Sequence, residues 1–126
     1  MALRILIADD SRSLREALKN MLGLSPDKWE ICGEAADGHE AVSQALALKP
    51  DVVLLDLSIP ALSGIEVVKA LRQQQSPTTV VLMSQQDPGV MKRLAASATV
   101  PFFVAKAELV TELPLVLDRI SEGQDK

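Results

Sequence analysis

The feature that most constrains this chain is a short apolar run that ends in one acid. Residues Val52 to Leu55 are all aliphatic, and they lead directly into Asp56. A run of this length, rich in β-branched residues and bounded by Pro50 and Pro60, indicates a strand buried on both faces. Strands of that kind occur in parallel sheets. An ionised carboxylate at the end of such a strand is costly unless another group pairs with it.

The composition excludes several classes of protein. The chain has 126 residues, is 48% hydrophobic and carries a net charge of −4, which together indicate one globular domain and not a disordered chain. It lacks the basic stripe that nucleic-acid-binding proteins usually carry. Cys32 is the only cysteine, so an internal disulfide and a site of several thiolates are excluded, and its strand context favours a core thiol over a reactive one.

The sequence also indicates where in the cell the protein is expected. No stretch approaches the roughly 18 consecutive apolar residues of a membrane span. The N-terminus leads directly into a strand-like run and does not have the pattern of a signal peptide. We therefore expect a cytoplasmic protein that contacts neither a membrane nor, through this domain, nucleic acid.

The order of apolar runs predicts strands that alternate with helices. Strands are expected at residues 3–8, 29–35, 52–56, 78–84 and 101–105, and the second is expected at the edge of the sheet, with Trp29, Ile31 and Gly33 on one face. Five strands that alternate with five helices indicate a parallel sheet with helices on both faces, a doubly wound α/β domain.

Local signals place the helix ends. Ser11 or Asp10 can cap the first helix, Asp37–Gly38 is read as a turn, Ser63 opens the third helix, and Asp87 is expected to cap the fourth.

A proline restricts where the last helix can begin. Pro114 would break a helix that began at Ala107, so we expect Thr111 to be the N-cap. The buried face of this helix would consist of Leu113, Val116, Leu117 and Ile120. The domain is expected to span residues 1–121, with residues 122–126 as a polar tail.

Polar residues fall where the predicted strands end. Asp9 and Asp10 follow the first strand, Asp56 ends the third, Ser84 ends the fourth and Lys106 follows the fifth. Ligands of parallel sheets bind outside the carboxyl ends of the strands. Three carboxylates there would repel one another, and Mg²⁺ would remove that conflict. A lysine and a serine hydroxyl suit phosphate oxygens. The pattern therefore indicates a site that holds a phosphoryl group on or near Asp56, whose carboxylate can act as a nucleophile.

Each of these residues also has a simpler interpretation. An acid pair before a helix is most often an N-cap, a serine that closes a strand is usually a turn residue, and a lysine after a strand is usually solvated. The joint placement of these residues at successive strand ends is what favours the functional interpretation.

With these residues in view, the chain resembles the receiver domain of two-component response regulators over about residues 3–121. The segments that carry the resemblance are Ile5–Asp10, Glu34–Gly38, Pro50–Pro60, Leu62–Ile65, Met83–Ser84 and Val104–Lys106. Residues 37–41 and 51–72 are similar to the subfamily that usually carries a helix-turn-helix output domain of the LuxR type. The resemblance implies a flavodoxin-like sheet of five strands in the order 2-1-3-4-5.

The resemblance also implies a chemistry for the acids. Asp56 would accept a phosphoryl group from a sensor histidine kinase, in a phosphorelay. Asp10 would bind Mg²⁺ directly and Asp9 through water, with Asp56 and the backbone carbonyl of Ser58 as further ligands.

The resemblance further implies that phosphorylation triggers a conformational switch. Lys106 would contact the phosphoryl oxygens, the Ser84 hydroxyl would move toward them on activation, and Phe103 is the switch aromatic. Phosphorylation would change the surface of the fourth helix, fifth strand and fifth helix, and so control an output domain or a downstream protein, with transcription as the expected output. The domain would dimerise on phosphorylation, through a face that the sequence does not specify.

Three departures from the family pattern matter. Gln85 stands where the family prefers a small residue, so we predict slower gain and loss of the phosphoryl group than in a Gln85→Ala variant. Phe103 replaces a common tyrosine and cannot form a hydrogen bond. Ala107 follows the lysine where many receivers have proline, so the usual cis peptide is not implied.

The sequence leaves one alternative function open and disfavours two others. A receiver that is never phosphorylated and acts as a protein-interaction module is the alternative. A phosphatase that uses an aspartyl-phosphate is disfavoured, because Ser58 stands where its second acid is needed; we expect no enzyme turnover beyond self-phosphorylation and its reversal. Glycine-rich nucleotide-binding motifs do not occur.

Overall fold

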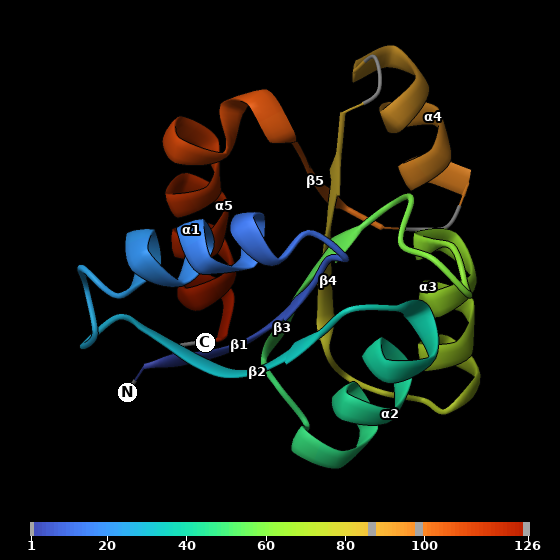
Figure 1. Cartoon of the computed structure of the whole chain (residues 1–126), viewed down its shortest axis with the longest axis horizontal. Helices are drawn as coiled ribbons and strands as arrows, with labels where there is room; N and C mark the ends of the chain where they lie inside the picture. Colours follow the sequence, from blue (N-terminus) through green and yellow to red (C-terminus); the bar gives the residue numbers. More distant parts are fainter. Residues whose placement is uncertain (1, 86–87, 98–99, 125–126) are drawn as a thin grey trace.

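Five parallel strands form one sheet in the order β2-β1-β3-β4-β5, as predicted. The structure is a computed structural model that describes residues 2–85, 88–97 and 100–124 (Figure 1). The strands are β1 (Leu3–Ala8), β2 (Trp29–Ala35), β3 (Val52–Asp56), β4 (Thr79–Ser84) and β5 (Phe102–Ala105). β2 lies at the edge of the sheet, where the sequence placed it.

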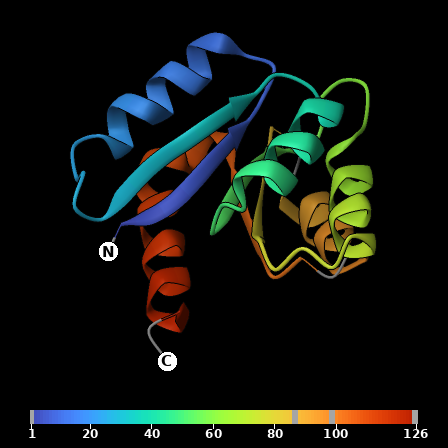
Figure 2. The same cartoon turned by 90° about the horizontal axis from the view of Figure 1, so that it is seen from below.

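Helices cover both faces of the sheet, which confirms the predicted doubly wound arrangement. They are α1 (Arg12–Leu22), α2 (Gly38–Leu48), α3 (Gly64–Gln73), α4 (Pro88–Ser97) and α5 (Leu109–Gln124), and a short 3₁₀ helix, η1 (Lys106–Glu108), precedes α5. Figure 2 shows α1 and α5 on one side of the sheet and α2, α3 and α4 on the other.

The core lies in two layers that β3 separates. All five residues of β3 are buried. Val53 and Leu55 pack with residues of α2 and α3, while Val52 and Leu54 pack with residues of α1 and α5. Each fully buried aliphatic side chain contributes roughly 1.5–3 kcal/mol. The central strand is therefore apolar on both faces, as its sequence predicted, and Asp56 is held at its end by packing on either side.

Side-chain caps start the helices close to where the sequence placed them. The Ser11 hydroxyl accepts the backbone N–H of Leu14 at 3.2 Å and caps α1. Ser63 and Glu66 form a capping box at α3. Asp37, read from the sequence as part of a turn, is the N-cap of α2. Asp87, the predicted cap of α4, lies outside the described residues.

The predicted start of the last helix is wrong. α5 begins at Leu109 and follows η1 without a break, so Pro114 lies inside it. A proline removes one N–H from the helical ladder, but the earlier start buries Leu109 as well as Leu113. Thr111 does not cap the helix, because its Oγ1 donates back to the carbonyl of Glu108 at 3.2 Å. The predicted buried face is confirmed. The helix continues to Gln124, into the predicted polar tail.

β2 is irregular, and this changes which residues share a face. Its register against β1 shifts between Ile5 and Leu6, because Ile5 pairs with Ile31 and Leu6 pairs with Gly33. Cys32 has no partner in that register, is partly buried, and has the pKa of its thiol raised by burial. The predicted strict alternation is therefore wrong beyond Ile31.

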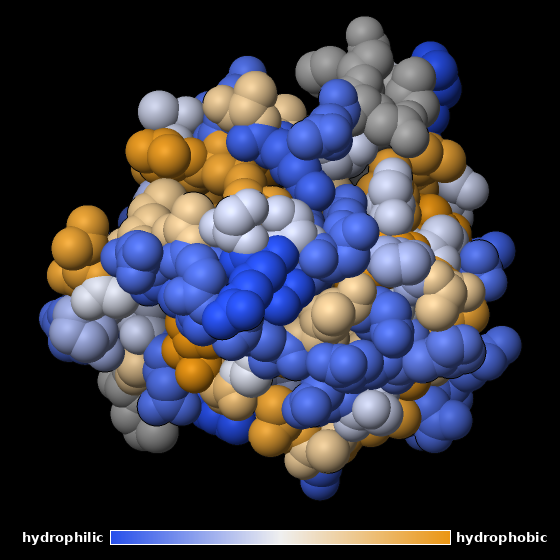
Figure 3. Space-filling view, in the orientation of Figure 1, coloured by the Kyte–Doolittle hydropathy of each residue, from blue (hydrophilic) through white to orange (hydrophobic). Residues whose placement is uncertain are grey.

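The face of the molecule viewed in Figure 1 is mostly polar. Figure 3 shows hydrophilic residues across the middle of the face viewed in Figure 1, with hydrophobic residues in small separate groups. Among the described helices, none combines the length and the apolar character that crossing a membrane requires.

Candidate functional site

Asp56 lies at the carboxyl end of β3, where its side chain is almost completely buried. The backbone N–H of Ser58 donates to its Oδ1 at 3.1 Å. The loop beyond it is held close: a Cβ on Gly64 would lie 2.8 Å from the Cα of Leu57, so only glycine fits there. Burial raises the pKa of Asp56, against the opposing effects of the Ser58 N–H and of Lys106. The loop therefore fixes one oxygen of Asp56. The raised pKa indicates that the nearby N–H and Lys106 do not fully compensate for burying the carboxylate charge.

Lys106 pairs with two of the predicted site acids. Its Nζ lies 2.9 Å from Oδ2 of Asp9 and 3.4 Å from Oδ1 of Asp56. Burial alone would lower the pKa of Lys106, but the two carboxylates outweigh it and the pKa is raised. The lysine is therefore a cation that already holds the ends of β1 and β3 together. The peptide bond between Lys106 and Ala107 is trans, as expected from the missing proline.

The acids fit a divalent cation. Asp9, Asp10 and Asp56 each place a carboxylate oxygen within 4.8 Å of the others. Asp9 is fully buried, and its Oδ2 accepts no hydrogen bond from the described residues, although it lies beside the Lys106 ammonium. One lysine cannot neutralise three carboxylates. An all-oxygen donor set with excess negative charge is the type that Mg²⁺ prefers.

A cleft of about 460 Å³ opens above these groups. Its described lining consists of Asp10, Ser11, Asp56, Ser58, Gln85 and Lys106. Gln85 is exposed, so the residue predicted to control access lies on the wall of this cleft. The cleft brings the predicted acceptor, one direct metal ligand and the lysine to a single surface that solvent can reach.

Neither of the two predicted switch residues is among the described residues that line the cleft. Ser84 is buried at the end of β4, one residue beyond Met83, which pairs with Asp56. Phe103 is partly buried and packs against the core layer that contains α2 and α3. Ser84 pairs with Ala105 of β5, the strand that contains Phe103. The roles of Ser84 and Phe103 in switching stay predictions.

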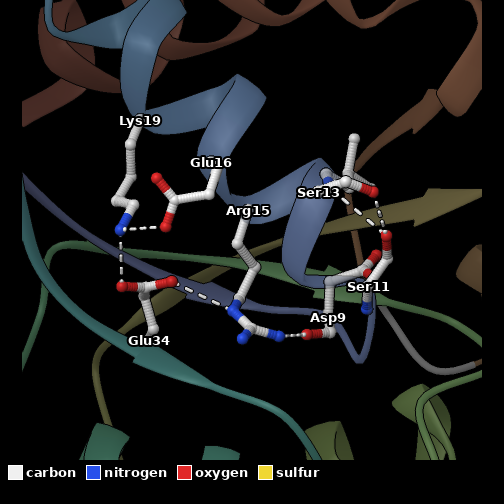
Figure 4. Close-up of polar contacts among 8 residues, drawn as sticks. Asp9, Ser11, Ser13, Arg15, Glu16, Lys19 and Glu34 are labelled. Atoms are coloured by element: carbon white, nitrogen blue, oxygen red, sulfur yellow. Dashed lines mark hydrogen bonds and ion pairs between the residues drawn. The ribbon is translucent and has the colours of Figure 1, made fainter.

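Arg15, which the sequence did not single out, contacts Asp9, and Glu34 binds Arg15 in turn. Arg15 of α1 donates from Nη1 to the backbone carbonyl of Asp9 at 2.6 Å and from Nε to Oε1 of Glu34 at 3.0 Å (Figure 4). Glu34 lies near the end of β2, 19 residues away in sequence. Only the register shift in β2 turns its side chain toward α1, so regular alternation could not have revealed this contact.

Comparison with known proteins identifies the family. Residues 5–117 match the model of the response regulator receiver domain. A protein-glutamate methylesterase/protein-glutamine glutaminase from Colwellia psychrerythraea is 34% identical over 126 residues, which cover 100% of this chain and 31% of that protein. The chain spans about a quarter to a third of the length of such relatives.

Solved structures agree with this match. The response regulator domain of Thermotoga maritima CheB has a TM-score of 0.82 and 30% identity, covering 100% of this chain and 98% of that one. A DNA-binding response regulator of the LuxR family from Staphylococcus aureus has a TM-score of 0.83 and 26% identity, covering 94% and 98%. Fold, site geometry and family match agree, and the chain belongs to the receiver domain family of two-component response regulators.

Proposed function

We propose that this receiver domain takes a phosphoryl group onto Asp56 from the phosphohistidine of a sensor histidine kinase. One observation carries the proposal: three carboxylates converge within 4.8 Å at a cleft where, among the residues that the structure describes, Lys106 is the one cation paired with them. Such a site has room for a phosphoryl group and a net negative charge that a divalent cation would balance.

The residues of the site supply the groups that the transfer needs. A carboxylate oxygen of Asp56 attacks phosphorus, the phosphorus–nitrogen bond of the donor breaks, and the imidazole leaves with its electron pair and takes a proton from water. Lys106 would stabilise the added charge on the phosphoryl oxygens. Asp9, Asp10, Asp56 and the Ser58 carbonyl would hold Mg²⁺, which supplies charge neutralisation when bound.

The consequence of phosphorylation is proposed to be a change of surface. An added dianion at Asp56 would draw the Ser84 hydroxyl, and the vacated space would admit Phe103 from its partly buried position. The face formed by α4, β5 and α5 would report this change to an output domain or partner. We propose no enzymatic turnover by the domain itself, since Ser58 stands where a phosphatase would need a second acid.

The relatives support two kinds of output. The LuxR-family similarity supports control of transcription. The methylesterase relatives, some of which match this chain over its whole length, support an enzymatic output instead. In both cases the receiver would act by holding or releasing a separate domain.

The test is phosphorylation by a small donor. The purified chain would be incubated with Mg²⁺ and acetyl phosphate and examined by intact mass. We expect one added phosphoryl group, which Asp56→Asn abolishes. Asp51→Asn, at the other end of β3, is the matched control and should keep the adduct, because an asparagine there can still accept the backbone N–H of Arg4. If the wild-type chain gains no phosphoryl group and also does not respond to beryllofluoride, the result would instead support an interaction module that works without phosphorylation.

A further inference from the structure

The peptide bond between the two adjacent acids is held by a side chain outside the cleft. The carbonyl of Asp9 belongs to the peptide that joins Asp9 to Asp10, and it accepts a hydrogen bond from Nη1 of Arg15 at 2.6 Å. A peptide unit is planar, so fixing its carbonyl fixes the direction in which the next residue leaves. Arg15 therefore acts on Asp10, the exposed acid of the cleft, without touching its carboxylate.

Asp9 is held at each of its polar atoms. Its N–H donates to the carbonyl of Ala35 at 3.0 Å, and its Oδ1 accepts the N–H of Ser11 at 2.8 Å. Its Oδ2 lies 2.9 Å from Lys106 Nζ, and its carbonyl is the atom that Arg15 binds. Of these four contacts, only the one from Arg15 is a direct hydrogen bond to the peptide that joins Asp9 to Asp10. The Ser11 N–H restrains this peptide only through the Asp9 side chain, so losing Arg15 would loosen the peptide plane while leaving the Asp9 carboxylate in place.

Arg15 is oriented from the other side by β2. Its Nε donates to Oε1 of Glu34 at 3.0 Å, and its side chain is only 15% exposed. Lys19 Nζ lies 2.9 Å from the other oxygen of Glu34 and 2.9 Å from Glu16 (Figure 4). A guanidinium can serve a carboxylate and a carbonyl at once, because its N–H groups leave a rigid plane in different directions.

We propose that Arg15 is a positioning residue, which sets the plane of the Asp9–Asp10 peptide so that the acid pair is arranged for a divalent cation before the cation binds. The inference rests on the proposed function, since it concerns the same Mg²⁺ site. Partners that orient metal ligands from outside the coordination shell commonly change metal affinity about 10–100-fold when they are lost.

The charge of Arg15 and its proposed positioning role predict opposite changes in Mg²⁺ affinity when Arg15 is replaced. Replacing Arg15 by a neutral residue removes a positive charge near the acids, so electrostatics alone would tighten binding of a cation. If Arg15 positions the peptide, the same replacement weakens binding. Arg15→Met keeps an unbranched apolar stem and leaves Glu34 paired with Lys19, so no carboxylate is left without a partner.

Arg4 provides a matched control at the opposite end of the sheet. Its guanidinium donates to the carbonyls of Leu48 at 2.8 Å and Lys49 at 3.1 Å, and its Nε lies 3.6 Å from Glu30 on β2. Arg4→Met therefore removes the same kinds of contact, far from the acids.

The experiment measures the Mg²⁺ dissociation constant of the unphosphorylated chain from amide chemical shifts of Asp10 and Ser58. We expect Arg15→Met to weaken Mg²⁺ binding about tenfold, Arg4→Met to leave it unchanged, and Arg15→Lys, which keeps the charge but not the planar fork, to weaken it as well. Unchanged or tighter binding by Arg15→Met would overturn the inference, as would equal weakening by Arg4→Met. If Arg15→Met does not fold, Arg15→Lys decides, and wild-type affinity in that variant overturns the inference. A wild-type chain that binds no Mg²⁺ would overturn the proposed function itself.

Discussion

The two ends of the sheet are made from the same residue types and use them differently. At the amino end, Asp51 precedes β3, and its Oδ2 accepts the backbone N–H of Arg4 at 2.8 Å. The Arg4 guanidinium donates to the carbonyls of Leu48 and Lys49 at the end of α2. Thr78 is buried there, and its Oγ1 donates to the carbonyl of Pro50 at 2.9 Å. Donors and acceptors at this end satisfy one another.

At the carboxyl end the acceptors outnumber the donors. Asp9, Asp10 and Asp56 converge, and Lys106 is the cation that the structure places between two of them. Burying charge without full compensation costs stability, so such a cluster persists only where something else selects it. Polar residues at strand ends therefore indicate a ligand site when their charges do not balance. They indicate a purely structural contact when the charges do balance.

The largest expected effect is the response of the two ends to Mg²⁺. A ligand that binds only the folded state at about 100 times its dissociation constant adds about 2.7 kcal/mol to the free energy of unfolding. We expect this gain in the wild type and in Asp51→Asn, and its loss in Asp10→Asn. Urea unfolding, followed by the fluorescence of the buried Trp29, measures it. A gain that survives in Asp10→Asn would mean that Mg²⁺ binds elsewhere.

The next effect compares the free energy of unfolding after replacing Asp56, at the end of β3, with that after replacing Asp51, which precedes the strand. The pKa of Asp56 is raised in the folded chain, so the folded state holds more protons than the unfolded state between the two pKa values. Stability therefore falls as pH rises through that window, and the full cost is present above the raised pKa. Without Mg²⁺ at pH 7, Asp56→Asn should be more stable than wild type by on the order of 1 kcal/mol.

Asp51→Asn should not share that gain, because Asp51 accepts a hydrogen bond and its replacement relieves no repulsion. The Asp56→Asn advantage should shrink as pH is lowered through the raised pKa of Asp56. Urea unfolding curves taken across this pH range give both results. An Asp56→Asn variant that is less stable than wild type at pH 7 would contradict the view that this end of the sheet is under electrostatic strain.

The placement of the site could be predicted because strand ends are visible in the sequence. The apolar run before Asp56 gives a buried strand, and parallel topology then brings Asp9, Asp10 and Lys106 to the same edge. The capping signal at Ser63 was also local and was confirmed. The start of α5 was not predictable in the same way, because burial of Leu109 outweighs the hydrogen bond that Pro114 cannot make.

The support for the acid pair was hidden from the sequence for a different reason. Strict alternation along β2 placed Glu34 on the face opposite Ile31. The register shift beyond Ile31 turns Glu34 toward α1, where it meets Arg15 and Lys19. A one-residue shift in one strand reverses the faces that follow it. Gly33, which lies at the shift, was a weak signal of it, because an isolated glycine in a strand often marks a bulge. The contacts that orient the acids therefore depend on tertiary structure.

The smallest expected effect compares the two glutamates of β2. Lys19 and, to a lesser degree, Arg15 hold the pKa of Glu34 below its usual value. Stability from such an acid is present above its unfolded pKa and is lost as pH falls through the lowered folded pKa. The Glu34 side chain is 34% exposed, so solvent screens these pairs and Glu34→Gln should cost less than about 1 kcal/mol at pH 7.

Glu30→Gln, at the other end of the strand, should cost nothing measurable, because Glu30 is 58% exposed and lies 3.6 Å from Arg4. Urea unfolding at pH 7 and in acid measures both variants. Equal costs would mean that the Arg15–Glu34 pair adds no more stability than a surface pair. A small cost for Glu34→Gln together with a large loss of Mg²⁺ affinity in Arg15→Met would separate the two contributions of this network. The ion pairs of Glu34 would then add little stability, while the hydrogen bond from Arg15 to the Asp9 carbonyl would set the geometry of the acids.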